Sequence, residues 1–118
     1  MQLSEIARIV EAECHTNEIN MEMDIHSACG SDLMSDVLAF VKDQALLLTG
    51  LTNPQVIRTA EMMDIRAIVF VRGKTPDSAT KRLALESGIN LFTTKMPLYI
   101  ACGKLYHAGL RGKEVCVE

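Results

Sequence analysis

The apolar positions of this chain change from helical spacing to strand spacing and back again. Near the start they fall on one face of a helix, which predicts an amphipathic helix over residues 3–14. Residues 19–26 then alternate apolar and polar side chains, the period of a strand with one solvated face. Helical spacing returns over residues 33–41, and we expect Ser31 to cap that helix. This part of the chain therefore predicts a helix, a strand near a sheet edge and a second helix.

Three short apolar runs follow, at residues 45–49, 67–71 and 90–94. Unbroken runs of this length are typical of parallel strands covered on both faces. A proline suited to a helix start follows each run, and Gly88 is suited to ending the middle helix. The order α-β-α-β-α-β-α-β-α predicts a single α/β domain with a mostly parallel sheet of four to five strands and helices on both faces. Residues 115–117 are a further candidate for an edge strand.

Composition narrows the class of protein. The chain has 118 residues, of which 48% are hydrophobic and 23% charged, which fits one globular domain and excludes a disordered chain. A net charge of −3 argues against nucleic-acid binding. The first residues carry charges too early for a signal peptide, and no apolar run is long enough to span a bilayer, so we expect a cytoplasmic protein without a membrane partner. The 4 cysteines include no C-x-x-C pair, so we expect free thiols and no zinc site. No cofactor is expected.

The stretch from Leu46 to Tyr106, which begins LLLTGLTNPQ, resembles the DRTGG domain family when the upstream GSDLMSDV is included. Its second half also resembles the N-terminal domain of HPr kinase/phosphatase. The resemblance covers residues 17–110. It implies an α/β module of about this length, found alone or beside CBS, phosphotransacetylase or P-loop domains. It also implies a regulatory or ligand-sensing role, without an assigned general activity.

Two motif positions depart from the family. Asp32, Thr49 and Gly50 match it, whereas Leu33 stands where the motif has Arg and Leu51 where it has the second Gly. Because Arg binds phosphate with two parallel hydrogen bonds, its loss removes the expected phosphate clamp. The departure counts against a highly charged nucleotide as the ligand.

Ligands of open parallel sheets bind outside the carboxyl ends of the strands. Four loops are expected at that edge, at residues 27–32, 49–53, 72–75 and 93–96. Their hydroxyl, amide and cationic groups, with nearby helix N-termini, suit a small anion or a phosphorylated metabolite. The predicted ligand-binding residues are Ser31, Asp32, Thr49, Gly50, Asn53, Arg72, Thr93, Thr94 and Lys95. The alternative is that these residues only cap helices and close turns.

An ATP-hydrolysing loop is excluded by spacing. Gly73-Lys74-Thr75 follows a predicted strand and precedes a helix, as the end of a Walker A motif does. That motif also needs a glycine five residues before Gly73, so that backbone N–H groups can wrap the phosphates. Ile68 stands at that position, inside the predicted strand.

Two other sets of residues raise the possibility of an enzyme. Glu22, Asp24 and His26 share one face of the predicted strand and could form a metal site or an acid–base pair, although a solvated strand face predicts the same pattern. Cys29 lies close before a predicted helix N-terminus and could act as a nucleophile. A small residue filling a tight turn explains it more simply.

The sequence as a whole predicts a non-catalytic regulatory or ligand-sensing module. It would bind a small anionic or nucleotide-like ligand at the C-terminal edge of the sheet. The alternative is a protein-interaction or assembly domain without a small-molecule site. An apolar face on so small a domain also predicts a homodimer. The methionines that could fill the core or line a pliable interface are Met21, Met23, Met62, Met63 and Met96.

Overall fold

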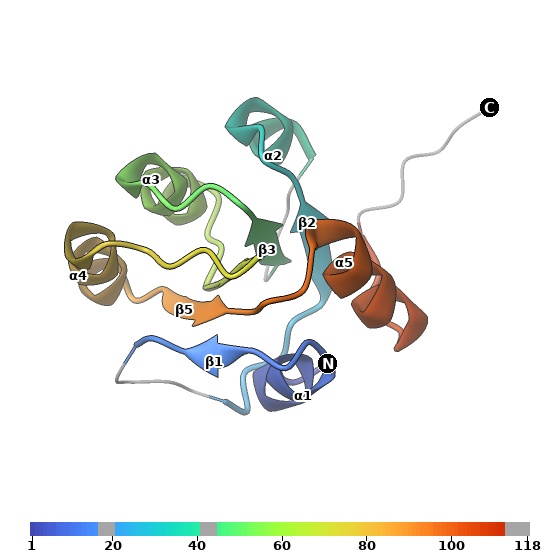
Figure 1. Cartoon of the computed structure of the whole chain (residues 1–118). Coiled ribbons are helices and arrows are strands. Elements are labelled where there is room, and N and C mark those ends of the chain that lie inside the picture. Colours follow the sequence, from blue (N-terminus) through green and yellow to red (C-terminus); the bar gives the residue numbers. More distant parts are fainter. Residues whose placement is uncertain (17–20, 41–44, 113–118) are drawn as a thin grey trace.

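The fold is a five-stranded α/β sheet between two layers of helices (Figure 1). The computed structural model describes residues 1–16, 21–40 and 45–112. The elements in chain order are α1 (Leu3–Ile9), β1 (Glu13–Cys14), β2 (Ser27–Gly30), α2 (Met34–Phe40), β3 (Ala45–Thr49), α3 (Pro54–Met62), β4 (Ala67–Phe70), α4 (Ser78–Ser87), β5 (Asn90–Thr93) and α5 (Leu98–His107). The strand order across the sheet is β1-β5-β4-β3-β2.

Four of the strands run in the same direction. β2 pairs with β3, β3 with β4 and β4 with β5, each in parallel, while β1 pairs antiparallel with β5. Because β3 and β4 lie inside the sheet and are covered on both faces, all their residues are buried. The predicted fold class, a mostly parallel α/β sheet with helices on both faces, is confirmed.

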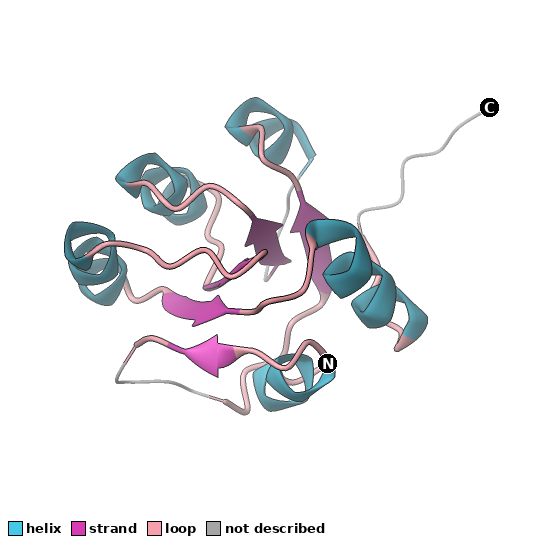
Figure 2. Ribbon diagram, viewed as in Figure 1, coloured by secondary structure: helices cyan, strands magenta, loops and turns pink. Residues whose placement is uncertain are grey.

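The helices divide between two hydrophobic cores, one on each face of the sheet. Leu3 and Ile6 of α1 join Ala101 and Leu105 of α5 in one core. The other core receives buried side chains from α2, α3 and α4, including Val37, Ile57 and Ala84. Figure 2 shows the strands lying between these two sets of helices. Residues alternate between the cores along β3, as the pleat requires.

The first predicted helix is too long. α1 ends at Ile9, and Glu11 turns the chain in the left-handed region with φ 52°. Glu13 and Cys14 then form β1. Val10 and Cys14 still face the same core as α1, although the chain has reversed between them. Their helical spacing therefore arose from two separate elements packed on one core.

The strand predicted over residues 19–26 is wrong in position, since the sheet strand is β2 at Ser27–Gly30. In the described part, residues 21–25 run beside the chain start, and Leu3 N–H donates to Met23 O at 3.0 Å. Only an isolated bridge between Gln2 and Asp24 is formed there. The alternation in burial is nevertheless present: Ile25 is buried, whereas Asp24 is exposed. The pattern came from an extended segment packed on the core and not from a strand of the sheet.

The remaining element boundaries agree closely with the prediction. β3 matches its predicted range, and β4 and β5 each end one residue earlier than predicted. Asp77 caps α4 by accepting a hydrogen bond from Thr80 N–H at 2.8 Å. Gly88 ends that helix with φ 71°, the left-handed conformation expected of its glycine. The proposed edge strand at residues 115–117 lies outside the described residues.

Candidate functional site

The candidate site lies where the parallel strands end. Since β2, β3, β4 and β5 point the same way, the segments that follow them leave the sheet at one edge. Backbone hydrogen bonds tie these segments together. Arg72 N–H donates to Met96 O at 2.9 Å, and Gly73 N–H donates to Thr94 O at 2.9 Å. The loops predicted to share one rim do so, except that most of residues 27–32 belong to β2 itself.

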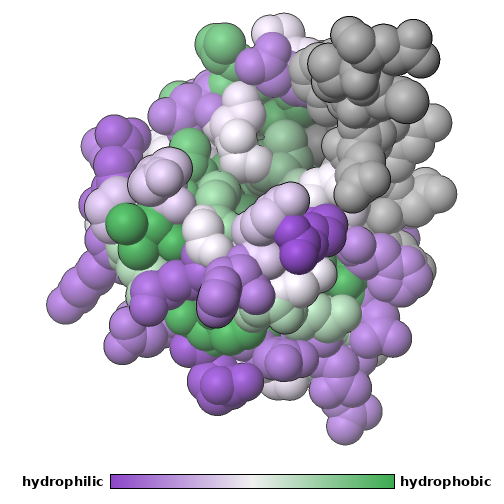
Figure 3. All heavy atoms as spheres, turned by 90° about the vertical axis from the view of Figure 1, so that its right-hand side faces the viewer, coloured by the Kyte–Doolittle hydropathy of each residue, from purple (hydrophilic) through white to green (hydrophobic). Residues whose placement is uncertain are grey.

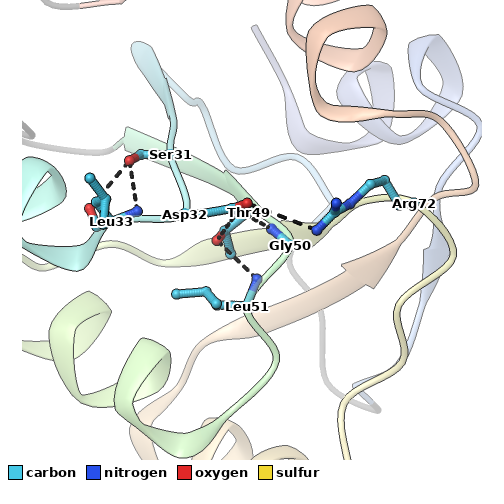
Figure 4. A network of polar contacts seen from close by, with 7 residues as sticks. All are labelled: Ser31, Asp32, Leu33, Thr49, Gly50, Leu51 and Arg72. Carbon is cyan, nitrogen blue, oxygen red and sulfur yellow. Dashed lines mark hydrogen bonds and ion pairs between the residues drawn. The ribbon is translucent and has the colours of Figure 1, made fainter.

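Asp32 connects three of the strand ends (Figure 4). Its Oδ1 accepts a hydrogen bond from Gly50 N–H at 2.7 Å and another from Thr49 Oγ1 at 3.3 Å. Its Oδ2 lies 3.9 Å from a guanidinium nitrogen of Arg72. The side chains of Arg72 and Asp32 remain 53% and 47% exposed, so both can still reach a molecule in solution.

Arg72 lies directly over the glycine of the second loop. A Cβ atom added to Gly50 would collide with the Arg72 guanidinium and would lie 3.3 Å from Asp32 Oδ1. Gly50 therefore permits the close approach of Arg72 to the loop backbone. The Arg72 backbone has φ 60°, a left-handed conformation that costs a non-glycine residue on the order of 1 kcal/mol. The backbone hydrogen bonds of Arg72 and Gly73 to the segment after β5 accompany this conformation.

Two of the predicted ligand-binding hydroxyls are already used inside the protein. Thr49 is fully buried; its Oγ1 donates to Asp32 and accepts from Leu51 N–H at 3.2 Å. Thr94 is 3% exposed, and its Oγ1 donates to Val10 O at 2.6 Å while accepting from Met96 N–H at 3.2 Å. For these two threonines the alternative interpretation, that they close turns, describes the observed contacts.

Ser31 and Asn53 stand at helix approaches with different contacts. The Ser31 hydroxyl accepts from Leu33 N–H at 3.0 Å, which closes a turn before α2. Because α2 begins at Met34, Ser31 is not its N-cap, and that prediction is wrong. Asn53 is the N-cap residue of α3, but its exposed side chain makes no capping hydrogen bond.

Thr93 and Lys95 belong to a cavity of about 440 Å³ beside β5. Its lining residues are Glu11, Glu13, His15, Gly73, Thr75, Thr93, Thr94, Lys95 and Met96. His15 Nε2 is 2.8 Å from Thr93 Oγ1. Sequence reasoning missed the first three lining residues, because it placed residues 11–14 in a helix. A left-handed residue followed by a two-residue strand leaves no periodic signal that would have revealed them.

The residues that raised the possibility of an enzyme are Cys29 and the set Glu22, Asp24 and His26. Burial, and secondarily the charge of Asp36, raises the pKa of the Cys29 thiol, which makes it less nucleophilic at neutral pH. Glu22, Asp24 and His26 do not share a sheet strand as predicted. Over residues 1–16, 21–40 and 45–112, no group of three His, Cys, Asp or Glu side chains is placed to hold a metal ion.

Comparison with known proteins shows the fold. No family model matches the chain, and no curated protein matches it. A solved structure described as the CBS and DRTGG domains of the regulatory region of Clostridium perfringens pyrophosphatase, complexed with the activator diadenosine tetraphosphate, is similar with a TM-score of 0.73 and 17% identity. The match covers 88% of this chain and 45% of that chain. The chain thus shares its fold with part of a regulatory region and spans less than half of it.

A membrane-spanning helix is not found in the described part of the chain, where every helix is too short or too polar. The similar structure contains a DRTGG domain, and the sequence of this chain resembles the same domain family. At 17% identity this likeness supports a related fold, and the family relationship stays a resemblance.

Proposed function

We propose that this chain is a non-catalytic regulatory module that binds a small anionic or nucleotide-like ligand at the C-terminal edge of its sheet. The contact of Asp32 and Arg72 above Gly50 carries the proposal. In this contact a half-exposed guanidinium lies over the loop that contains Gly50, at the edge where open parallel sheets bind ligands. The ligand-bound regulatory region that shares this fold supports the same role.

Arg72 would supply the phosphate contact that the missing motif arginine leaves open. Leu33 stands at the motif position and is 62% exposed. Because its side chain is aliphatic, it offers no charge to a ligand. Arg72 comes from the end of β4 yet lies beside Asp32, the residue that precedes Leu33. Asn53, Lys95 and Thr93 would add amide, cationic and hydroxyl groups on the same rim, while Thr49 and Thr94 would shape its loops.

A thermal-shift screen of nucleotides and phosphorylated metabolites, with diadenosine tetraphosphate among them, tests this proposal. A ligand at 100 times its Kd stabilises the folded state by about 2.7 kcal/mol, which raises the Tm by on the order of 10 °C for a domain of this size. Arg72→Gln should remove most of the shift. Arg82→Gln, an exposed arginine on α4, is the matched control and should retain it. A screen without any shift at millimolar ligand would overturn the proposal.

We also propose that the module acts as a homodimer. Helix α5 exposes large side chains: Tyr99 is 86% exposed, Tyr106 56% and Ile100 44%. Figure 3, which looks toward the side of the molecule where α5 lies, shows hydrophobic residues in green among hydrophilic residues in purple on this face. Sedimentation equilibrium should give a dimer mass, and Tyr99→Glu with Ile100→Glu should give a monomer. A monomer mass for the unchanged protein at micromolar concentration would refute the dimer.

The exposed face of α5 also favours a second candidate function, a protein-interaction domain without a ligand site. Under this alternative, a partner would still bind after Arg72, Asn53 and Lys95 are replaced together by Ala. Loss of partner binding on Tyr99→Glu alone would favour it over the ligand-sensing role.

A further inference from the structure

The cavity beside β5 has walls of opposite charge. One wall comes from the N-terminal segment and carries Glu11 and Glu13. The loops after β4 and β5 contribute Gly73, Thr75 and Lys95. The charged residues Glu11, Glu13 and Lys95 are all exposed. Of the charged residues that line this cavity, two are therefore acidic and one is basic.

Three polar residues of this cavity, Glu13, His15 and Thr93, are positioned by the pairing of β1 with β5. Glu13 and Thr93 are directly paired in the antiparallel ladder of β1 and β5, so their side chains lie on the same face of the sheet. His15 is two residues beyond Glu13 and therefore also lies on that face, where its Nε2 is 2.8 Å from Thr93 Oγ1. The neighbouring pair in the ladder, Cys14 and Phe92, faces the opposite side and packs in the core.

This arrangement does not suit a simple anion. A phosphate attracted by Lys95 would share the cavity with the Glu11 and Glu13 carboxylates, whose charge opposes it. A ligand that also brings a positive group would turn that repulsion into attraction. The cavity volume of about 440 Å³ is within the range that holds a small metabolite.

We propose that the cavity binds a phosphate ester that also carries a protonated amino group. The phosphate lies toward Lys95, and the ammonium group lies toward Glu11 and Glu13. The hydroxyl of Thr93 and the ring of His15 supply hydrogen-bonding groups between them. This inference rests on the proposed function, because it names the class of anionic ligand that the same edge of the sheet would take.

The test is an NMR titration of the full chain labelled with nitrogen-15. The probes are O-phosphoethanolamine, ethyl phosphate, which lacks the amine, and ethylamine, which lacks the phosphate. O-phosphoethanolamine should shift the amide signals of residues 73–75 and 93–96 and bind about fivefold more tightly than either other probe, as expected for one partly exposed charge pair. Glu11→Gln with Glu13→Gln should reduce its advantage over ethyl phosphate to less than twofold. Glu86→Gln, on the exposed side of α4, should leave the advantage unchanged.

Any other result of the titration would contradict a specific part of the proposal. Equal binding of ethyl phosphate and O-phosphoethanolamine at these amides overturns the amino group and leaves the proposed anion-binding function standing. Equal binding of ethylamine and O-phosphoethanolamine overturns the phosphate ester, and so does an unchanged affinity in Lys95→Gln. If none of the probes shifts these amides, this inference falls, and the thermal-shift screen decides the proposed function separately.

Discussion

Replacing Asp32 should show how strongly the strand ends are held together. Asp32→Ala removes the acceptor of the hydrogen bonds from Gly50 N–H and Thr49 Oγ1, and it removes the partner of Arg72. Asp32→Asn keeps an oxygen that can accept from Gly50 N–H and removes only the charge. The difference between the two variants therefore separates the hydrogen bonds from the ion pair.

The expected magnitudes follow from exposure and distance. Hydrogen bonds to a charged group contribute about 1.5–3 kcal/mol, and the lower end applies because the Asp32 side chain is 47% exposed and water can replace it. The ion pair with Arg72 spans 3.9 Å between two half-exposed side chains, which makes it worth less than about 1 kcal/mol. We expect Asp32→Ala to lower the free energy of unfolding by about 1–2 kcal/mol and Asp32→Asn by about 0.5 kcal/mol.

Urea unfolding followed by circular dichroism measures both variants, with Arg72→Gln as the variant that removes only the ion pair. Arg72→Gln should resemble Asp32→Asn. Equal losses for Asp32→Ala and Asp32→Asn would refute the reasoning, because the bond to Gly50 would then contribute nothing. Ligand binding gives a second readout: Asp32→Asn should strengthen binding of an inorganic phosphate probe, since it removes the negative charge that neutralises Arg72.

Three further predictions concern other parts of the molecule. Gly30→Ala places a Cβ 2.5 Å from Cys102 Sγ and should cost about 1–3 kcal/mol of stability, and Cys102→Ala in the same chain should recover most of this loss in a urea-unfolding double-mutant cycle. Cys29 should react with iodoacetamide at pH 7 more slowly in the folded chain than in urea, because burial raises its pKa; equal rates would contradict this. The hydrogen bond from Thr80 N–H lowers the pKa of Asp77, so its contribution to stability is present above the unfolded-state pKa and is lost as the pH falls through the folded-state pKa. Asp77→Asn should therefore lose less stability than the unchanged chain between pH 5 and pH 3, and parallel losses would count against the cap.

The buried strands could be predicted because burial on both faces leaves one strong signal. β4 has no polar position, and in β3 only the last residue, Thr49, is polar. A proline begins the helix after β3. The N-terminal third gave a poorer result for a physical reason. Met21, Met23 and Ile25 pack on the core from an extended segment, and an extended segment produces the same alternation whether or not it joins the sheet.

Part of the candidate site could also be predicted from the sequence, and part of it could not. Parallel strands and the rule for their carboxyl ends were enough to predict that the loops carrying Asp32, Gly50 and Arg72 would share one edge of the sheet, but not that these residues would contact one another. The use of Thr94 by Val10 O could not be predicted, because it depends on where the chain goes after α1. Glu11, Glu13 and His15 were missed for the same reason, since their position beside Thr93 follows from the pairing of β1 with β5.

These contacts bear on how a module with this site would select a ligand. The rim carries Arg72, Lys74 and Lys95, and against them stand Asp32, Glu11 and Glu13, so the charges that face the strand ends cancel. A balanced rim attracts anions weakly at long range, and selection must then depend on where each charge lies. At one end of this rim Asp32 is paired with Arg72, and at the other end Glu11 and Glu13 line the cavity beside β5. A ligand long enough to contact both ends with matching charges would be favoured over inorganic phosphate, and the same two ends explain why Asp32→Asn should strengthen binding of a simple anion while weakening this selectivity.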